Sequence, residues 1–301
     1  MMRRWASIFF AGCGLCCTSF STNNRRRRQH RQQIIVQEGS SSSHQWNHEP
    51  FDFSSRIGWD KFYREGNQSS DEQSLDELEY EWHAHIPHSV IVDVLSPTID
   101  AASTFFQNSN TTADDAKLPS ILLIGTGNSA LPRVLHDAFD TPVKVTCLDY
   151  SPVCVEMIKA MYSEICPNMD FVLGDATRLK QAVNDSKYDV IVDKGLLDAL
   201  MCGEGFDSDL EKLMSGIDEV LTRREWGISI LICFQLSTSS KQSLVELASS
   251  GKDNASTALF WDFDCPVEGS ENGRATFNVA RRSSLRENGI VDVDHMITNW
   301  S

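Results

Sequence analysis

The chain has 301 residues with 41% hydrophobic content, enough to bury a sizeable core in one large domain or two small ones. Its formal net charge of −15 is uneven, because residues 1–37 contain seven Arg and no Asp or Glu, which leaves about −22 on the rest. An acidic body repels phosphate backbones, so we expect no nucleic-acid partner and favour a basic protein partner, although acidity for solubility alone explains the charge equally well.

Cysteine and histidine patterns predict no metal site. The nine Cys are an odd number scattered through the chain, which is typical of buried free thiols rather than a disulfide framework. Cys13 and Cys16 form a CxxC pair, but no second pair follows at zinc spacing. His83, His85 and His88 lie close together without a fourth ligand at a known spacing, so solvated or core histidines are the favoured reading.

The first 37 residues have the composition of a targeting segment. Two Arg precede a short apolar run, and an acid-free stretch rich in Arg and Ser follows. A mitochondrial or plastid presequence, a signal peptide and a disordered basic leader of a cytoplasmic protein all fit this pattern. We expect an organellar location, otherwise a cytoplasmic one. We expect no stable membrane insertion after the leader is removed, because the apolar run is too short to cross a bilayer.

Residues 38–55 have linker composition, and the folded part is expected to begin after them. Helical segments are predicted at 56–65 and 75–95, within an N-terminal part (56–119) that covers the cofactor site. The main domain is assigned to 120–285, and 286–301 to a C-terminal tail.

Strands and helices are predicted to alternate through the main domain. Short apolar runs predict parallel strands, and residues with helical spacing follow them, at 129–138, 152–162, 196–202, 207–222 and 239–249. The predicted strands are 120–124, 143–148, 169–173, 188–193 and 228–234. Two further runs, 258–264 and 274–282, flank a turn-rich segment and predict an antiparallel hairpin. This pattern predicts an α/β, Rossmann-like doubly wound sheet of seven strands with the last strand antiparallel.

The turn after the first strand is the most informative motif. Gly125 and Gly127, followed by Asn128, let the backbone bend and approach a ligand closely. The segment GTGNSA fits the dinucleotide pattern GxGxx(G/A), which alone does not separate nicotinamide enzymes from methyltransferases. Asp149, followed by Tyr150, ends the second strand, where such sheets place a carboxylate against a ribose diol. Together these residues predict a nucleoside-binding crevice.

Features further along the chain favour S-adenosylmethionine over a nicotinamide dinucleotide. Asp175 ends the third strand, where its carboxylate would accept a hydrogen bond from the adenine amino group while the Ala176 backbone contacts the ring. A DKG turn and a terminal hairpin follow, instead of a repeated mononucleotide half. A nicotinamide-dependent oxidoreductase would also need a hydride-transfer acid or a Tyr-x-x-x-Lys pair after the fourth strand, and neither is present there. A non-catalytic adaptor that kept the fold is a further alternative.

Five segments together resemble the seven-stranded methyltransferases related to the lysine methyltransferases of translation elongation factor 1A. They are WDKFY (59–63), YEW (80–82), LLIGTGNSAL (122–131), LDYSPVCVEMIK (148–159) and YDVIVDKGLLDAL (188–200). The resemblance implies a class I fold with strand order 3-2-1-4-5-7-6 and S-adenosylmethionine as methyl donor. It also implies that the acceptor is a lysine or an N-terminal amine of a basic protein such as elongation factor 1A. His83 departs from the family pattern, which usually has an aromatic residue there. Small-molecule methylation stays open, because the fold does not fix the acceptor.

Three residues are the catalytic candidates. Asp193 in the DKG turn is predicted to orient the acceptor or the cofactor, with a strand-end cap as the alternative. Trp82 is predicted to pack against the donor and exclude water, with a core aromatic as the alternative, and Glu81 to cover the same exit. Lys194 is expected to pair with a nearby carboxylate, and Asp198 to act as a first-turn acid of the next helix.

Overall fold

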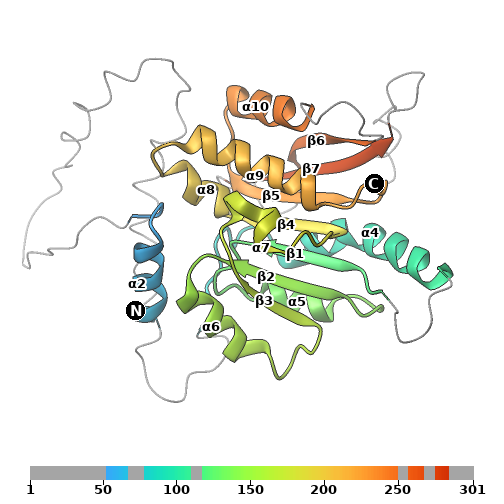
Figure 1. The fold of residues 1–301 in the computed structure, drawn as a ribbon, viewed down its shortest axis with the longest axis horizontal. Helices are drawn as coiled ribbons and strands as arrows, with labels where there is room; N and C mark the ends of the chain where they lie inside the picture. The colour runs from blue at the N-terminus through green and yellow to red at the C-terminus, as the bar shows by residue number, and fades with distance from the viewer. Residues whose placement is uncertain (1–51, 67–77, 110–116, 250–256, 268–274, 285–301) are drawn as a thin grey trace, which may run out of the picture.

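A seven-stranded sheet organises the chain (Figure 1), in a computed structural model that describes residues 52–66, 78–109, 117–249, 257–267 and 275–284. The strand order is β3-β2-β1-β4-β5-β7-β6, which confirms the predicted fold class and topology. The strands are β1 (Ser120–Ile124), β2 (Lys144–Asp149), β3 (Met169–Leu173), β4 (Val190–Lys194), β5 (Ile228–Phe234), β6 (Thr257–Cys265) and β7 (Ala275–Ser284). The pairs β1–β2, β2–β3, β1–β4 and β4–β5 are parallel, whereas β7 runs antiparallel to both β5 and β6.

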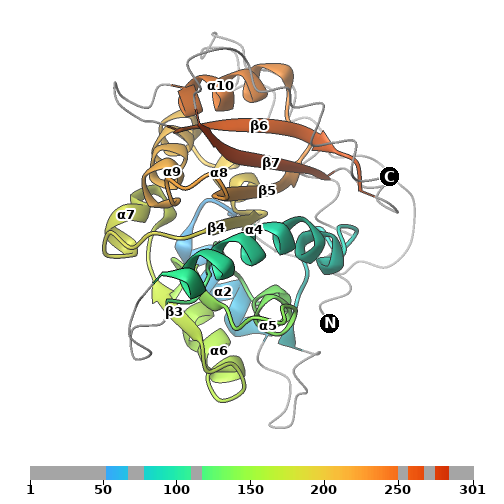
Figure 2. The same cartoon turned by 90° about the vertical axis from the view of Figure 1, so that its right-hand side faces the viewer.

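Helices cover both faces of the sheet (Figure 2). They are α2 (Arg56–Gly66), α4 (His88–Asn108), α5 (Leu131–Asp137), α6 (Pro152–Tyr162), α7 (Leu179–Ala182), α8 (Leu196–Met201), α9 (Phe206–Val220) and α10 (Thr238–Ser249). Successive side chains of a strand point to opposite faces. Accordingly, Ile121 and Leu123 of β1 join a hydrophobic cluster with α4, α5 and α6, and Leu122 and Ile124 join another with α7, α9 and α10. The sheet is therefore doubly wound.

Most predicted elements agree with the structure to within two residues. The bounds of β1, α6, β3 and β5 coincide with the predicted ones. Five apolar residues that recur at helical spacing along α9 or just after it are all buried: Leu210, Leu213, Met214, Ile217 and Leu221. Apolar periodicity within single segments was therefore sufficient to locate them.

The predicted helix over 75–95 is wrong in its bounds. Between Glu79 and Pro87 the chain makes turns, and α4 begins only at His88, with Pro87 as its N-cap. The helix then continues to Asn108, beyond the end of the predicted segment. A proline fits the start of a helix well, because it has no amide hydrogen to leave unbonded. The residues before α4 are thus free to lie across the ligand-binding edge of the sheet.

Helix α4 is also, among the described residues, the one helix that is long and apolar enough to cross a membrane by length and composition. Core helices can meet the same criterion, and its residues Ile91, Leu95 and Ile99 are at most 1% exposed within the hydrophobic core. The proposed leader (1–37), most of the linker (38–55) and the C-terminal tail (286–301) lie outside the described residues.

Candidate active site

A cleft of about 1600 Å³ crosses the carboxyl ends of all five parallel strands. Gly125 follows β1, Asp149 ends β2, Gly174 follows β3, Lys194 ends β4 and Phe234 ends β5, and each of them lines the cleft. Ligands of open α/β sheets bind at this edge, so the cleft is the candidate active site. We call the part at β1, β2 and β3 the cofactor half, and the part at β4 and β5 the acceptor half.

The glycine turn of the cofactor half has no room for side chains. Gly125 and Gly127 have φ angles of +62° and +58°, in the left-handed region that favours glycine. A Cβ at Gly125 would lie 2.8 Å from the Cβ of Leu196, and a Cβ at Gly127 would lie 3.3 Å from the Tyr63 hydroxyl. Tyr63 belongs to α2, so this helix lies against the turn from the outside.

Asp149 connects the glycine turn to the end of β2. Its Oδ2 accepts a hydrogen bond from the Gly127 amide at 3.0 Å, and its Oδ1 accepts one from the Ser151 amide at 2.9 Å. Burial raises the pKa of Asp149, although both amides favour the anion. Asp149 also lines the cleft, at the strand end where the ribose prediction requires a carboxylate.

The predicted adenine contacts lie beside Asp149. Asp175 is exposed at the cleft and caps the short 3-10 turn Ala176–Arg178, where its Oδ1 accepts from the amide and the hydroxyl of Thr177 at 2.9 and 2.8 Å. Ala176 and Tyr150 line the cleft beside it. The predicted cofactor residues of the three strand ends therefore lie together.

Asn128 is one of two predicted site residues that do not line the cleft. Its side-chain Nδ2 donates to the Leu78 carbonyl at 2.6 Å, and its backbone carbonyl accepts from the Tyr80 amide at 3.0 Å. Asn128 thus anchors the segment before α4 to the glycine turn.

Asp193 is the second predicted site residue that does not line the cleft. It is 1% exposed, and its carboxylate accepts hydrogen bonds from the amides of Leu196 at 2.8 Å and Leu197 at 3.1 Å. Burial raises its pKa, and the nearby Asp198 adds to this shift. These contacts are those of a cap on α8, so the geometry favours a positioning role over direct contact with a ligand.

Glu81 is a clamp that joins three elements at the cleft wall. Its Oε1 accepts from the Ala130 amide at 2.7 Å and the Ser129 hydroxyl at 2.8 Å, in the turn before α5. Its Oε2 accepts from Lys194 Nζ at 2.6 Å, at the end of β4, and lies 3.1 Å from Nε2 of His88, at the start of α4. The pairing expected for Lys194 is present, and its partner is Glu81.

The charges of this clamp are mutually stabilised. Burial alone would raise the pKa of Glu81, but the hydrogen bond from His88 and the positive charge of Lys194 outweigh it and lower that pKa to about 2. Burial lowers the pKa of Lys194, whose side chain is 7% exposed, and Glu81 opposes this shift. Since each oxygen of Glu81 is engaged, the clamp holds the residues after it against the ends of β4 and α8.

Trp82, which follows the clamp, lies within an aromatic cluster. Its ring is 5.7 Å from Trp59, 5.1 Å from Tyr80 and 6.4 Å from Phe53, measured between centroids, in edge-to-face arrangements. These four residues and Tyr63 line the cleft. Aromatic faces attract cations, so this wall suits a sulfonium or an ammonium group.

His83 and Asp198 form a pair in the acceptor half that the sequence did not predict. His83 Nε2 lies 2.7 Å from Asp198 Oδ2, and the imidazole packs edge-to-face on Phe234 with centroids 5.0 Å apart. Both members of the pair line the cleft. They are 115 positions apart, and no local spacing pattern marks such a contact.

The histidine cluster does not converge on one point. His83 is bound to Asp198 and His88 to Glu81, so two of the three rings contact different carboxylates.

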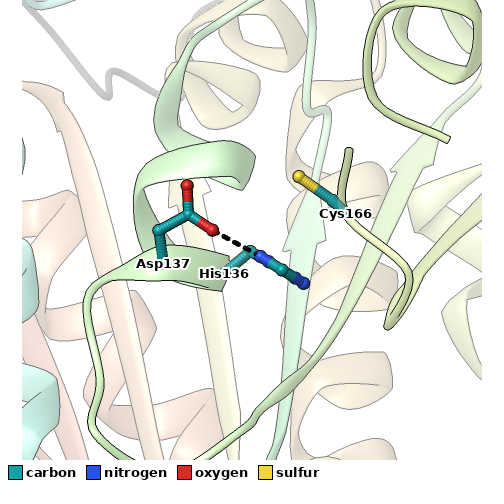
Figure 3. A group of neighbouring side chains, drawn as sticks. All are labelled: His136, Asp137 and Cys166. Atoms are coloured by element: carbon teal, nitrogen blue, oxygen red, sulfur yellow. Dashed lines mark hydrogen bonds and ion pairs between the residues drawn. The ribbon is translucent and has the colours of Figure 1, made fainter. Parts of the chain in front are cut away.

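A separate group of His136, Asp137 and Cys166 has its potential ligand atoms within 4.8 Å of one another (Figure 3). There His136 already pairs with Asp137 at 2.6 Å, and burial raises the pKa of the Cys166 thiol, which disfavours the thiolate that binds metals.

The residues present fit S-adenosylmethionine. The backbone cradle at Gly125 and Gly127 would be filled by any Cβ, which is the geometry of a close ligand approach. Asp149 offers buried acceptor capacity beside it, and Asp175 lies at the next strand end. The aromatic wall that includes Trp82 supplies an environment for the positively charged sulfur.

Comparisons with known proteins agree with this fit. Residues 121–223 match the family described as a methyltransferase domain. A Xenopus laevis eEF1A lysine and N-terminal methyltransferase is 36% identical over 104 residues, which cover 34% of this chain and 14% of that protein. A Danio rerio mitochondrial citrate synthase-lysine N-methyltransferase is 28% identical over 150 residues, covering 48% of this chain and 53% of that protein. A Bos taurus EEF1A lysine methyltransferase 4 is 29% identical over 147 residues, covering 48% and 45%.

The chain thus spans about half the length, or less, of these curated relatives. The matched region holds β1 to β4, α9 and the glycine turn, with Asp149 and Asp175. This part of the chain thus matches the methyltransferase-domain family, within a sheet whose strand order is the one that the class I resemblance implies.

Proposed function

We propose that the protein transfers a methyl group from S-adenosylmethionine to an amine of a protein, either a lysine side chain or an N-terminus. The observation that carries the proposal is the continuity of one cleft. A cradle for a nucleoside in the cofactor half opens directly into an acceptor half lined by aromatic rings, histidines and carboxylates. These groups attract and orient a cationic acceptor.

Each site residue would have a separate role in this reaction. Asp149 and Asp175 would hold the nucleoside by charge-assisted hydrogen bonds, worth about 1.5–3 kcal/mol each for interactions with charged groups. When bound, S-adenosylmethionine supplies an activated methyl group on a positively charged sulfur. The clamp formed by Glu81 would fix the position of Trp82, whose ring would exclude water from the line of attack. Asp193 would hold α8, and with it the acceptor wall, by capping the helix.

The names of the relatives favour a protein acceptor, because they describe methyltransferases of elongation factor 1A and of citrate synthase. The acidic charge of about −22 outside residues 1–37 would attract a basic surface and repel nucleic acid. Small-molecule methylation is the second candidate, because the same cleft would accept a free amine of suitable size.

Cofactor binding tests the first half of the proposal. We expect calorimetric titration to show binding of S-adenosylhomocysteine and none of NADH. We expect Asp149→Asn to weaken that binding at least about tenfold, since one charge-assisted hydrogen bond is lost. Asp170→Asn is the matched control, because Asp170 lies exposed on β3 and pairs with Lys144 outside the cleft. Equal affinity of the wild type and Asp149→Asn would contradict the assignment.

Methyl transfer tests the second half. Tritiated S-adenosylmethionine is incubated with the protein and a dialysed cell extract, and then with purified elongation factor 1A and citrate synthase. Label in protein supports the proposal, whereas label only in small molecules would replace it with the second candidate.

We further propose import into an organelle. The Arg-rich residues 1–37 that suggest it lie outside the described residues, and one relative carries the word mitochondrial in its name. Microscopy of a fluorescent fusion to residues 1–37 checks this, and a diffuse cytoplasmic signal would contradict it.

A further inference from the structure

The acceptor half contains a histidine–carboxylate pair whose arrangement is that of an oriented proton acceptor. We propose that His83, oriented by Asp198, takes the proton that an ammonium acceptor must lose before it can be methylated. The inference rests on the proposed amine methylation and adds a catalytic residue, His83, and a positioning residue, Asp198.

A lysine acceptor must lose a proton before its nitrogen can attack a methyl group. A lysine amine has a pKa of about 10.4, so near neutral pH only about one molecule in a thousand carries the lone pair that attacks a methyl group. A positioned base typically accelerates such proton transfers by about 10²–10⁴-fold. Two catalytic candidates of the sequence are engaged elsewhere: Glu81 binds Lys194 and His88, and Asp193, which does not line the cleft, accepts from the α8 amides.

The pair is held in place from several sides. Asp198 Oδ1 accepts a hydrogen bond from the Phe234 amide at 2.9 Å, so only its Oδ2 faces His83, at 2.7 Å. The imidazole lies on the ring of Phe234, and its Nε2 would be 3.7 Å from a Cβ placed at Gly195. His83 also has a φ angle of +53°. A non-glycine residue in this region is strained, and such strain persists only where the surrounding structure imposes it.

The contact with Asp198 determines which ring nitrogen is basic. An ionised carboxylate only accepts hydrogen bonds, so Nε2 must carry the hydrogen that bridges the two groups. In the neutral ring Nδ1 then has no hydrogen and is the atom able to accept a proton. The resulting imidazolium would be stabilised by Asp198, in the same way that a buried aspartate orients and stabilises the histidine of a catalytic triad.

A proton passes from the acceptor ammonium to Nδ1 of His83, which leaves the acceptor nitrogen with a lone pair. That lone pair forms the N–C bond to the methyl carbon while the C–S bond breaks and its electron pair stays on sulfur. The proton leaves His83 to water after the methylated amine departs, so no oxidant or further reactant is needed.

The titratable groups placed near His83 come from α8, from β4 and from its own segment. Asp198 faces it from α8, and Lys194, at the end of β4, is neutralised by Glu81. Phe234 of β5 is uncharged. His85 lies in the same segment, with its ring centroid 6.0 Å from that of His83, and burial, followed by the proximity of His83, lowers the pKa of His85. Nε2 of His85 is buried without a hydrogen-bond partner among the described residues, although His85 lines the cleft.

The test is the pH dependence of two variants. His83→Phe keeps an aromatic ring but has no base, and Asp198→Asn offers an amide hydrogen to Nε2, which favours the wrong tautomer. The assay measures tritium incorporated into proteins of a dialysed cell extract. At pH 7 we expect both variants to be about 100-fold slower than wild type. Near pH 10, where about a third of lysine amines are deprotonated, the difference should shrink to a few-fold.

Two measurements separate a specific effect from damage to the fold. Calorimetry should give the same S-adenosylhomocysteine affinity for wild type and both variants, and nitrogen NMR should show the Nε2–H tautomer of His83 in wild type but not in Asp198→Asn. The matched control is His136→Phe, on α5 outside the cleft, which should have the activity of wild type at every pH.

The outcomes are distinguishable. If wild type labels no protein and binds no S-adenosylhomocysteine, the proposed function fails. If wild type labels protein but His83→Phe is equally active, or is slower by the same factor at pH 7 and pH 10, His83 is not the proton acceptor and only this inference fails.

Discussion

The two halves of the cleft are built in different ways. In the cofactor half, the groups that face a ligand are backbone turns and acids at the ends of β1, β2 and β3, such as Gly125 and Asp149. In the acceptor half, residues 80–85 lie across the ends of β4 and β5 and line the cleft together with residues of α8 and β5. There the contacts join residues far apart in the chain, such as Glu81 with Lys194, 113 positions away. The first half depends on local backbone shape and the second on paired side-chain charges.

This difference predicts which substitutions each half tolerates. A change of backbone conformation should abolish cofactor binding with modest effects elsewhere. A change of charge should act mainly on stability and on the acceptor.

The largest effect is expected for Gly125→Ala. The new Cβ would lie 2.8 Å from Leu196 Cβ and 3.1 Å from its Cδ1, at a φ angle of +62°, so the turn must move away from its ligand. We expect the affinity for S-adenosylhomocysteine, measured by calorimetry, to fall about 100-fold, since loss of two or more hydrogen bonds costs about 3 kcal/mol.

Gly205→Ala is the matched control for this change. Gly205 also has a positive φ, +87°, but a Cβ there would meet nothing within 4 Å, and the residue does not line the cleft. We expect about 1–2 kcal/mol of lost stability from backbone strain alone, with the cofactor affinity unchanged within about twofold. If both variants lost affinity equally, global strain rather than the cradle would explain the result.

Glu81→Gln should act on stability instead. The pKa of Glu81 is lowered to about 2 in the folded protein, against about 4.3 when unfolded, so the ionised clamp contributes about 3 kcal/mol at neutral pH. A lowered folded pKa gives stability that is present above the unfolded pKa and is lost as pH falls through the folded one. We expect urea unfolding to show this contribution at pH 7, and its progressive loss between about pH 5 and pH 2.

The difference between wild type and Glu81→Gln isolates the clamp from other acids that titrate in the same range. At pH 7 the variant should be about 3 kcal/mol less stable, and near pH 2 the two curves should approach each other. Glu156→Gln, exposed on α6, should match wild type throughout. A constant difference between wild type and Glu81→Gln at every pH would mean that packing, not charge, holds the clamp.

The same division explains how much the sequence could predict. The strands, the glycine turn and the acids at the strand ends follow from apolar runs and short spacings, because backbone geometry is encoded by neighbouring residues. Asp149 and Asp175 could therefore be placed in the cleft. The pairs Glu81–Lys194 and His83–Asp198 could not, because nothing in the local pattern says which distant side chains will meet.

The error at α4 has a related cause. Apolar spacing continues from residue 75 to 95, yet Pro87 starts the helix rather than lying within it. The turns before Pro87 depend on contacts with distant parts of the fold. Asn128 is one of these contacts: its backbone carbonyl accepts from the Tyr80 amide, and its side chain donates to the Leu78 carbonyl. The backbone that carries Glu81 and Trp82 was thus missed, as were their long-range contacts, although both residues were predicted as site residues.

Asp175→Asn should have the smallest effect of the series. Asp175 Oδ1 caps the turn at Thr177, and an asparagine oxygen can make the same two contacts. The protein should keep its thermal stability, while the loss of charge opposite the adenine amino group should weaken S-adenosylhomocysteine binding only about three- to tenfold, or roughly 1 kcal/mol. Asp175→Ala removes the cap as well and should lose about a further 1 kcal/mol of stability. A loss of affinity in Asp175→Asn as large as that of Gly125→Ala would contradict the division, because it would give an exposed charge the weight assigned to the backbone cradle.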